Sequence, residues 1–225
     1  NPSPSLLLGA VDLSPLQVAQ LYEYIAADGH ALPLVAVRGV MDNKGQAIKR
    51  YEVKGGEGEY QTAARLTTWA MQQVVNGGTA AAIGNSGLSW LHAAGKTGTS
   101  DSQRDSWFAG FTGDRLAIVW MGRDDNKPTG LYGATGSMRV WQELFRKLPT
   151  RPLSAAPGEG LEMAYVNTQT GKRTDPSCEG ARQFPFVAGY VPEAEEGCFW
   201  QRFKGMFGGG DEQQPTPAVP SNPTD

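Results

Sequence analysis

The heptapeptide AGKTGTS, residues 94–100, decides how the rest of this sequence is interpreted. Its Gly95-Lys96-Thr97 matches the end of a phosphate-binding loop, G-x-x-x-x-G-K-[ST], which would require a first glycine at position 90. That position holds Trp90, and the residues after Lys96 predict a polar turn and then a strand, whereas a phosphate loop leads into a helix. A nucleotide site is therefore disfavoured.

The residue types of the heptapeptide favour a polar strand at a sheet edge beside a groove. Lys96 supplies a positive charge, and the hydroxyls of Thr97 and Thr99 can hydrogen-bond a carboxylate. Gly98 lacks the Cβ that would keep a ligand away from the backbone. An ordinary polar edge strand, in which Lys and Thr discourage pairing with other chains, explains these four residues equally well.

Composition narrows the class of protein. A chain of 225 residues with 40% hydrophobic residues is long enough for one domain or one and a half. The net charge of −3 comes from interspersed signs without a basic cluster, so no nucleic-acid partner is expected. Apolar runs fall short of the roughly 20 residues that cross a bilayer. A targeting or anchoring element is expected outside the chain.

Three strands are predicted after the second helix described below: Leu91–Thr99, Arg104–Phe111 and Leu116–Met121. The link at residues 112–115 is too short for a parallel crossover, so the last two strands are expected to be antiparallel. Apolar residues occupy both alternating faces of these strands, which predicts a sheet covered on both sides. The first strand is expected at an edge.

Helical patterns surround these strands. Ser14 and Pro15 match the cap and first position of a helix that ends at Asp28-Gly29. Residues 35–51 predict two short strands around a turn, and further helices are expected over about 62–75 and 137–148. The apolar faces of these last two helices are expected to comprise Ala63, Leu66, Ala70 and Val74, and Met138, Trp141, Leu144 and Phe145.

Longer motifs carry a family resemblance. Residues 105–110 read D-x-W-F-A-G, residues 120–124 read W-x-G-R-D, and residues 132–136 read Y-G-A-T-G before a helix. With residues 6–29 and 67–79, they resemble the final third of the transpeptidase domain of class A, bifunctional penicillin-binding proteins, especially the one-b type of Gram-negative bacteria. The resemblance implies an α/β (α+β) fold of the penicillin-binding protein and serine β-lactamase kind, present here as a partial domain.

The resemblance also implies a division of the chain. Residues 1–150 are expected to form the C-terminal portion of the transpeptidase domain, and residues 151–207 an extension that carries both cysteines. Residues 208–225 have little to bury and are expected to be a disordered tail.

The implied activity is the cross-linking of peptidoglycan stem peptides through an acyl-enzyme. The family's nucleophile and base lie in an S-x-x-K motif, which this chain lacks, because no serine has a lysine three residues later. The supporting S-x-N motif is also missing, and the related Tyr165-Val166-Asn167 falls in the wrong order, after K-T-G. Both motifs are expected upstream of residue 1, in a protein that also carries a peptidoglycan glycosyltransferase.

The resemblance assigns roles to the heptapeptide. Lys96 would tune the proton transfers between the absent serine and lysine and attract the substrate. Thr97, Gly98, Thr99 and Ser100 would line the substrate-binding strand, with the hydroxyls on the terminal carboxylate. The backbone N–H of Thr99 would be one donor of the oxyanion hole. Ser100 stands where the family often has a second threonine, which keeps a hydroxyl in place.

No cofactor or metal is expected. His30 follows a helix end and His92 is predicted on a strand without a second ligand, so both are interpreted as structural. The Asp124-Asp125-Asn126 run lacks the glycine and closing glutamate of a calcium loop.

Cys178 and Cys198 could be an isolated pair of thiols or a disulfide, and sequence alone leaves both open. The family resemblance implies the periplasmic face of the inner membrane, reached through an upstream transmembrane helix, where the disulfide is favoured. The implied partners are stem peptides ending in D-Ala-D-Ala, β-lactams and the upstream part of the same protein. An outer-membrane lipoprotein activator and proteins of the division and elongation machineries are further implied partners.

Two alternatives remain. A carboxypeptidase or β-lactamase of the same fold would share the K-T-G strand and differ in its rate of deacylation. A non-catalytic interaction module would account for the absent serine and for the extension.

Overall fold

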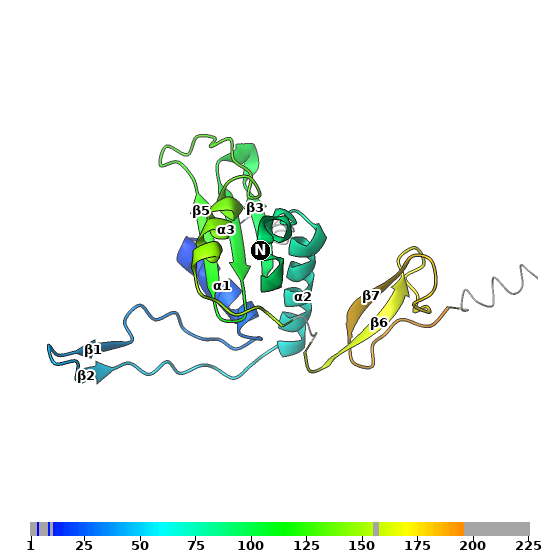
Figure 1. Cartoon of the computed structure of the whole chain (residues 1–225), viewed down its shortest axis with the longest axis horizontal. Coiled ribbons are helices and arrows are strands. Elements are labelled where there is room, and N and C mark those ends of the chain that lie inside the picture. The colour runs from blue at the N-terminus through cyan, green and yellow to red at the C-terminus, as the bar shows by residue number, and fades with distance from the viewer. Residues whose placement is uncertain (1–3, 5–8, 10, 155–157, 196–225) are drawn as a thin grey trace, which may run out of the picture. The chain divides into compact units, whose positions relative to one another are not determined.

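The computed structural model describes residues 4, 9, 11–154 and 158–195, and every structural statement below refers to these (Figure 1). They form two compact units. The first comprises the described residues up to 162 together with 185–189, and the second comprises 163–184 and 190–195. The predicted boundary at residue 150 and the predicted extension are not tested by this division, and the predicted tail lies outside the described residues.

A three-stranded antiparallel sheet forms the centre of the first unit (Figure 1). Its strands are β3 (Ala94–Thr99), β4 (Ser106–Phe111) and β5 (Leu116–Met121), in that order across the sheet. The antiparallel arrangement and the edge position of the first strand confirm the sequence-based prediction. The strand β3 begins three residues later than the predicted Leu91, because Ser89–Leu91 form a short helical turn, η3.

Three helices pack against this sheet. The helix α1 (Pro15–Ala26) lies against β4 and β5, α2 (Gln61–Gly77) against β3, and α3 (Ser137–Lys147) against β4 and β5. As predicted, Ser14 caps α1: its side chain accepts a hydrogen bond from the Gln17 backbone, and the Gln17 side chain bonds the Ser14 backbone in return. Further short helical turns are η2 (Gly84–Leu88) and η4 (Asp101–Gln103).

The two faces of the sheet carry separate apolar clusters. Phe108 is fully buried in the larger cluster, edge-on to Trp141 of α3, and Trp141 stacks on Phe145 at 3.9 Å between ring centroids. Phe111, three residues along the same strand, points to the other face. There it packs with Met71 of α2 and with partly buried side chains of α1. The predicted cover on both faces is confirmed.

The predicted apolar face of α2 was wrong in part. The buried residues of the helix are Ala64, Met71, Gln72 and Val75. Of the predicted residues, Val74 packs partly buried against the larger cluster and Leu66 is partly buried, whereas Ala63 and Ala70 are exposed. The buried face includes a polar residue, because the Gln72 side chain, which is 8% exposed, donates hydrogen bonds to the carbonyls of His92 and Ser154. Gln142 of α3 is likewise buried and donates to Ala82, whereas Leu144 is 43% exposed.

The predicted hairpin at residues 35–51 is present, with shorter strands. It consists of β1 (Gly39–Met41) and β2 (Ala47–Arg50), joined by a turn in which the Asp42 carboxylate accepts from the backbone of Lys44 and Gln46. Every residue of both strands is exposed, including Met41 and Ile48 at 62% and 68%.

A second two-stranded sheet consists of β6 (Leu161–Asn167) and β7 (Ala181–Val187). The strand-like sequence at residues 163–166 lies within β6, whereas no strand was predicted over β7, which contains Pro185, a residue that cannot donate to the ladder. In the second unit, the Glu195 carboxylate accepts hydrogen bonds from Thr170 and Asn167, which hold its pKa below the ordinary value.

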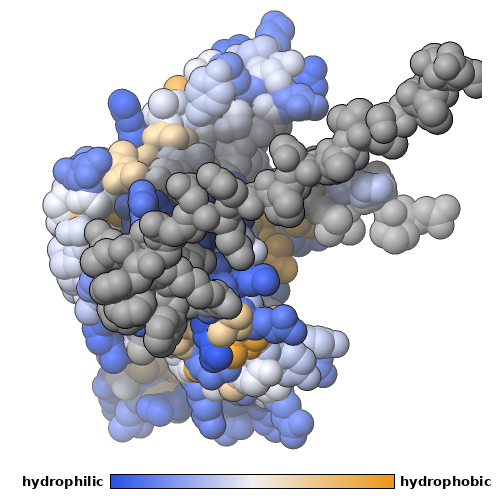
Figure 2. Space-filling view, turned by 90° about the vertical axis from the view of Figure 1, so that its right-hand side faces the viewer, coloured by the Kyte–Doolittle hydropathy of each residue, from blue (hydrophilic) through white to orange (hydrophobic). Residues whose placement is uncertain are grey.

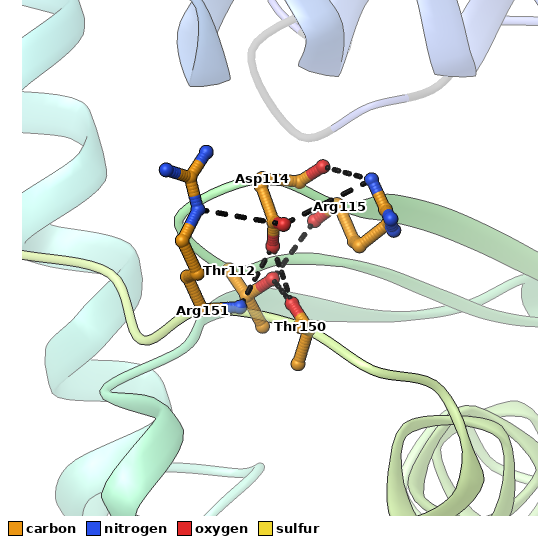
Figure 3. A network of polar contacts seen from close by, with 5 residues as sticks. All are labelled: Thr112, Asp114, Arg115, Thr150 and Arg151. Atoms are coloured by element: carbon orange, nitrogen blue, oxygen red, sulfur yellow. Dashed lines mark hydrogen bonds and ion pairs between the residues drawn. The ribbon is translucent and has the colours of Figure 1, made fainter.

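One end of the three-stranded sheet is closed by a polar network (Figure 3). In the turn between β4 and β5, the Asp114 carboxylate accepts hydrogen bonds from the Thr150 hydroxyl at 2.7 Å and the Arg151 backbone at 2.8 Å. Thr150 and Thr112 also join their hydroxyls at 2.5 Å. The N–H of Arg151, followed by the hydroxyl of Thr150, holds the pKa of Asp114 below its ordinary value. The network fixes this turn to the segment that follows α3.

Candidate functional site

The K-T-G strand, β3, forms one edge of the sheet, and its last residue, Thr99, lies at the end away from the β4–β5 turn. Lys96 pairs with Ala109 and Thr99 with Ser106, and the opposite side of β3 has no strand partner among the described residues. Lys96 and Thr99 are exposed, and Thr97 and Gly98 are partly exposed. The K-T-G strand thus lies at an open sheet edge.

Backbone amides point outward along this edge. Just beyond the two strands, the N–H of Ser100 donates to the carbonyl of Asp105, the residue before β4. In an antiparallel ladder, the residues that bond the neighbouring strand alternate, so the amides of Gly98 and Lys96 also face β4. Those of Thr97 and Thr99 therefore point away from the sheet. This is the direction that an oxyanion-hole donor at Thr99 requires.

The two threonine hydroxyls each have a partner within the chain. Thr97 Oγ1 lies 2.8 Å from Thr79 Oγ1, just beyond the C-terminal end of α2. Thr99 Oγ1 accepts a hydrogen bond from the backbone N–H of Gly133 at 3.0 Å. Since an amide only donates, the hydroxyl proton of Thr99 remains available for a ligand.

Gly133 approaches the strand so closely that a side chain would not fit. A Cβ at this position would lie 2.7 Å from the carbonyl oxygens of Gly98 and Trp107 and 2.9 Å from the Gly98 nitrogen. Gly98 is also restricted, because its own Cβ would lie 3.1 Å from that of Trp107. The two glycines let the 132–136 segment lie directly on the K-T-G strand.

Two buried serines hold that segment in place. The Ser106 hydroxyl donates to the Tyr132 carbonyl and accepts from the Ser137 backbone, each at 3.0 Å. The Ser137 hydroxyl donates back to the Ser106 carbonyl at 2.6 Å. Both serines are 0% exposed. This pair ties the N-terminal end of α3 to β4, opposite Thr99.

Lys96 brings the positive charge to the edge. Its ammonium group donates to the carbonyl of Thr97 at 2.8 Å while the side chain stays exposed. The charge has no carboxylate partner among the described ion pairs. Such an arrangement is suited to binding an anionic group.

Ser100 differs from the other residues of the strand. Its hydroxyl donates to the Asp105 carboxylate and accepts from the Asp105 backbone, both at 2.8 Å. The other carboxylate oxygen of Asp105 accepts from the indole N–H of Trp120 at 2.9 Å. Because the proton of Ser100 is already engaged, a direct bond to substrate would require this contact to break. Its substrate-binding role stays a prediction.

Neither histidine is a hydrogen-bond partner of the Thr97 or Thr99 hydroxyl among the described hydrogen bonds. His30 contacts the Gln61 side chain at 3.0 Å, beside the start of α2. The prediction that His92 lies on a strand was wrong. It is a left-handed residue, φ 48°, that ends the turn η3 before β3 begins. Within the part of the chain that the structure describes, no three His, Cys, Asp or Glu residues gather as a metal site.

Cys178 is buried, with 8% exposure, and no free thiol occurs among the described residues. Cys198 lies outside those residues, so pairing of Cys178 with Cys198 stays a prediction.

No helix in the described ranges is long and apolar enough to span a bilayer. On the face shown in Figure 2, the described surface is largely hydrophilic, with apolar residues in small patches.

Sequence reasoning missed two residues of the site. Thr79 follows the Asn76-Gly77-Gly78 helix stop, and nothing in its spacing indicates a contact with Thr97. Gly133 was noted only as part of the Y-G-A-T-G motif. A glycine before a helix, in a motif that the resemblance singled out, was the available signal for a close backbone approach.

Comparison with known proteins identifies the class to which this fold and edge strand belong. The model of the penicillin-binding protein transpeptidase domain matches residues 3–148, so the chain belongs to this family. A crystal structure of penicillin-binding protein 1A from Haemophilus influenzae superposes with a TM-score of 0.71 at 24% identity, over 86% of this chain and 35% of that one. This likeness supports the fold.

Curated relatives narrow the type to penicillin-binding protein 1B. The chain is 41% identical over 161 residues to that protein from Escherichia coli K12, covering 72% of this chain and 19% of the relative. It is 38% identical over 185 residues to the Vibrio cholerae protein, covering 82% of this chain and 24% of the relative. The chain thus spans about a fifth to a quarter of the length of these relatives.

Proposed function

We propose that this chain supplies the K-T-G wall of a peptidoglycan D,D-transpeptidase site, in a protein whose nucleophilic serine and its lysine lie upstream of residue 1. The observation that carries the proposal is the open edge of β3. There, the Lys96 charge, two hydroxyls and an outward-facing amide lie on consecutive residues. These groups suit a ligand that has a carboxylate next to a reacting carbonyl.

The reaction is an acyl transfer. The serine oxygen attacks the carbonyl carbon of the penultimate D-alanine, the peptide C–N bond breaks, and the terminal D-alanine leaves with a proton. An amine of a neighbouring stem peptide then attacks the ester, forms the cross-link and releases the serine with its proton. With a β-lactam, the ring C–N bond opens and the leaving nitrogen stays attached to the acyl group.

Each residue of the strand has a role in this reaction. The Thr97 and Thr99 hydroxyls bind the terminal carboxylate, and Lys96 adds its charge and tunes the upstream serine and lysine. The N–H of Thr99 donates to the developing oxyanion, and loss of such a donor typically costs about 10²–10³ in rate. Gly98 allows the substrate backbone to approach. Ser100 is proposed to contribute to the same subsite, where a direct bond to the substrate would require its bond to Asp105 to break.

The whole protein is proposed to carry a peptidoglycan glycosyltransferase and a transmembrane anchor upstream, with this chain on the periplasmic side. A disulfide between Cys178 and Cys198 fits that oxidising compartment. Its proposed partners are D-Ala-D-Ala stem peptides and β-lactams, an outer-membrane lipoprotein activator, and proteins of division and elongation.

Acylation of the full-length protein by penicillin tests this proposal. Lys96→Ala is expected to lower the second-order acylation rate about 10- to 100-fold, because it removes a charge-assisted contact. Lys44→Ala, in the exposed turn of the β1–β2 hairpin, is the matched control and should retain the wild-type rate. Equal rates for Lys96→Ala and wild type would contradict the proposal and favour a non-catalytic interaction module.

A further inference from the structure

Thr79 is the one side chain outside the K-T-G strand whose hydroxyl contacts a hydroxyl of that strand among the described hydrogen bonds. Its Oγ1 lies 2.8 Å from Thr97 Oγ1, although the two residues are 18 apart in sequence. The contact joins the segment after α2 to the middle of the edge strand. It is a contact between two side chains and adds no backbone hydrogen bond to the helix or to the sheet.

The segment that carries Thr79 is held in place on both sides. The backbone amides of Gly78 and Ala80 both donate to the carbonyl of Val74, at 3.0 and 3.1 Å. Gly78 fits against that turn so closely that a Cβ would lie 2.9 Å from the Val74 Cα. Ala80 is 0% exposed. Thr79 therefore stands on a fixed support, and its hydroxyl can define the position of its partner.

The direction of the Thr79–Thr97 bond follows from the chemistry of the ligand. A hydroxyl has one proton and can accept further hydrogen bonds. When Thr97 donates its proton to a carboxylate, the bond between the two threonines requires Thr79 to be the donor. The result is a chain that runs from Thr79 to Thr97 and on to the carboxylate. Donation by Thr79 also strengthens the donor character of Thr97.

Thr99 has the same arrangement with a different donor. The Gly133 amide donates to Thr99 Oγ1. With Thr79 as the donor to Thr97, both hydroxyls accept a bond from a neighbouring segment and keep their own protons for the ligand. We propose that Thr79 is a positioning residue of the carboxylate subsite, which acts through Thr97 and not on the substrate itself. This inference rests on the proposed function of the K-T-G strand.

A double-mutant cycle in the full-length protein tests the inference, with the second-order rate of acylation by penicillin as readout. Thr79→Val keeps the shape of the side chain and removes the donor. It is expected to slow acylation about tenfold, the upper range for one neutral hydrogen bond. Thr79→Ser restores a hydroxyl and is expected to recover most of the rate. Added to Thr97→Val, the Thr79→Val change should cost nothing more, because its effect passes through Thr97.

Three outcomes would overturn the inference. Thr79→Val could acylate at the wild-type rate, Thr79→Ser could fail to recover activity, or the two valine substitutions could lower the rate independently. A thermal melt separates loss of folding from loss of positioning, because the inference expects all four variants to melt close to the wild type. If the wild-type protein itself forms no penicillin adduct, the proposed function fails. If it does and only the Thr79 pattern is absent, the inference alone fails.

Discussion

Threonine hydroxyls occur at both ends of the central sheet, but they bond within the chain at one end and remain open to a ligand at the other. At the β4–β5 turn, Thr112 and Thr150 bond each other, and Asp114 takes up the remaining donors. At the K-T-G end, Thr99 accepts a bond from the Gly133 amide and Thr97 shares one with Thr79, and the outward amides of the strand remain for a ligand. Each end is tied to one terminus of α3, by residues 150–151 and by 132–137.

The difference separates a structural polar cluster from a functional one. At the β4–β5 turn, the Asp114 carboxylate accepts the hydrogen bonds of the Thr150 hydroxyl and the Arg151 backbone, so these donors are not left for a ligand carboxylate and this end is closed. At the other end, no side-chain carboxylate bonds the Thr97 or Thr99 hydroxyl among the described hydrogen bonds. We infer that the substrate's carboxylate takes the place there that Asp114 occupies at the closed end. Substitutions at matched glycines in the two ends test this comparison directly.

The largest effect is expected from Gly133→Ala at the open end. The new methyl group would lie 2.7 Å from two backbone carbonyl oxygens and force the 132–136 segment off β3. Displacement of the strand and loss of the amide bond to Thr99 should lower acylation by penicillin about 10²-fold.

Gly77→Ala is the control for this substitution, because an added Cβ at Gly77 meets nothing within 4 Å and φ is not positive there. It should leave the acylation rate unchanged. A Gly133→Ala protein that acylates as fast as Gly77→Ala would show that the segment does not support the site.

A smaller effect on catalysis, with a clear loss of stability, is expected from Gly113→Ala at the closed end. A Cβ there would lie 2.4 Å from the Pro152 carbonyl oxygen. Relief of this contact should cost about 1–3 kcal/mol of the free energy of unfolding, measured by denaturant titration. The acylation rate per folded molecule should stay near the wild-type value. A selective loss of acylation would contradict the division between the two ends.

The smallest effect concerns the pH dependence of stability through Asp114. Its pKa is lowered in the folded protein, chiefly by the Arg151 backbone and then by the Thr150 hydroxyl, so the unfolded state binds its proton more tightly. The contribution is present above the unfolded pKa and is lost as pH falls through the folded pKa. Asp114→Asn should therefore flatten the acid limb of the stability curve, and Thr150→Val should do so in part. An unchanged acid limb in Asp114→Asn would exclude this role.

Much of the fold could be predicted from local patterns. The Ser14-Pro15 start of α1, the short β4–β5 link and the alternation of the strands depend on neighbours in sequence, and each prediction was confirmed. The orientation of α2 was missed because buried Gln72 bonds two distant carbonyls. Strand β7 was not predicted, and Pro185 within it weakens the local signal for a strand, because proline cannot donate to the ladder.

The candidate site likewise contains residues that the sequence indicates and residues that only the structure brings to the strand. Lys96, Thr97, Gly98 and Thr99 were singled out from the sequence because they are adjacent on one strand and match a family motif, although their residue types alone fit an ordinary edge strand equally well. The roles of Thr79 and Gly133 depend on contacts across 18 and 34 residues, which no spacing in the sequence indicates. The partner of Ser100 could not be predicted either, because its bond to Asp105 depends on the conformation of the β3–β4 turn.

The measurement that tests the central claim most directly is mapping the penicillin adduct on the full-length protein, by intact mass and then by peptide mass. The account predicts one adduct, on a serine of an S-x-x-K motif outside residues 1–225, and its loss when that serine is replaced by alanine. An adduct on a serine of this chain, such as Ser100 or Ser86, would contradict it. The nucleophile would then lie within this chain instead of upstream of it.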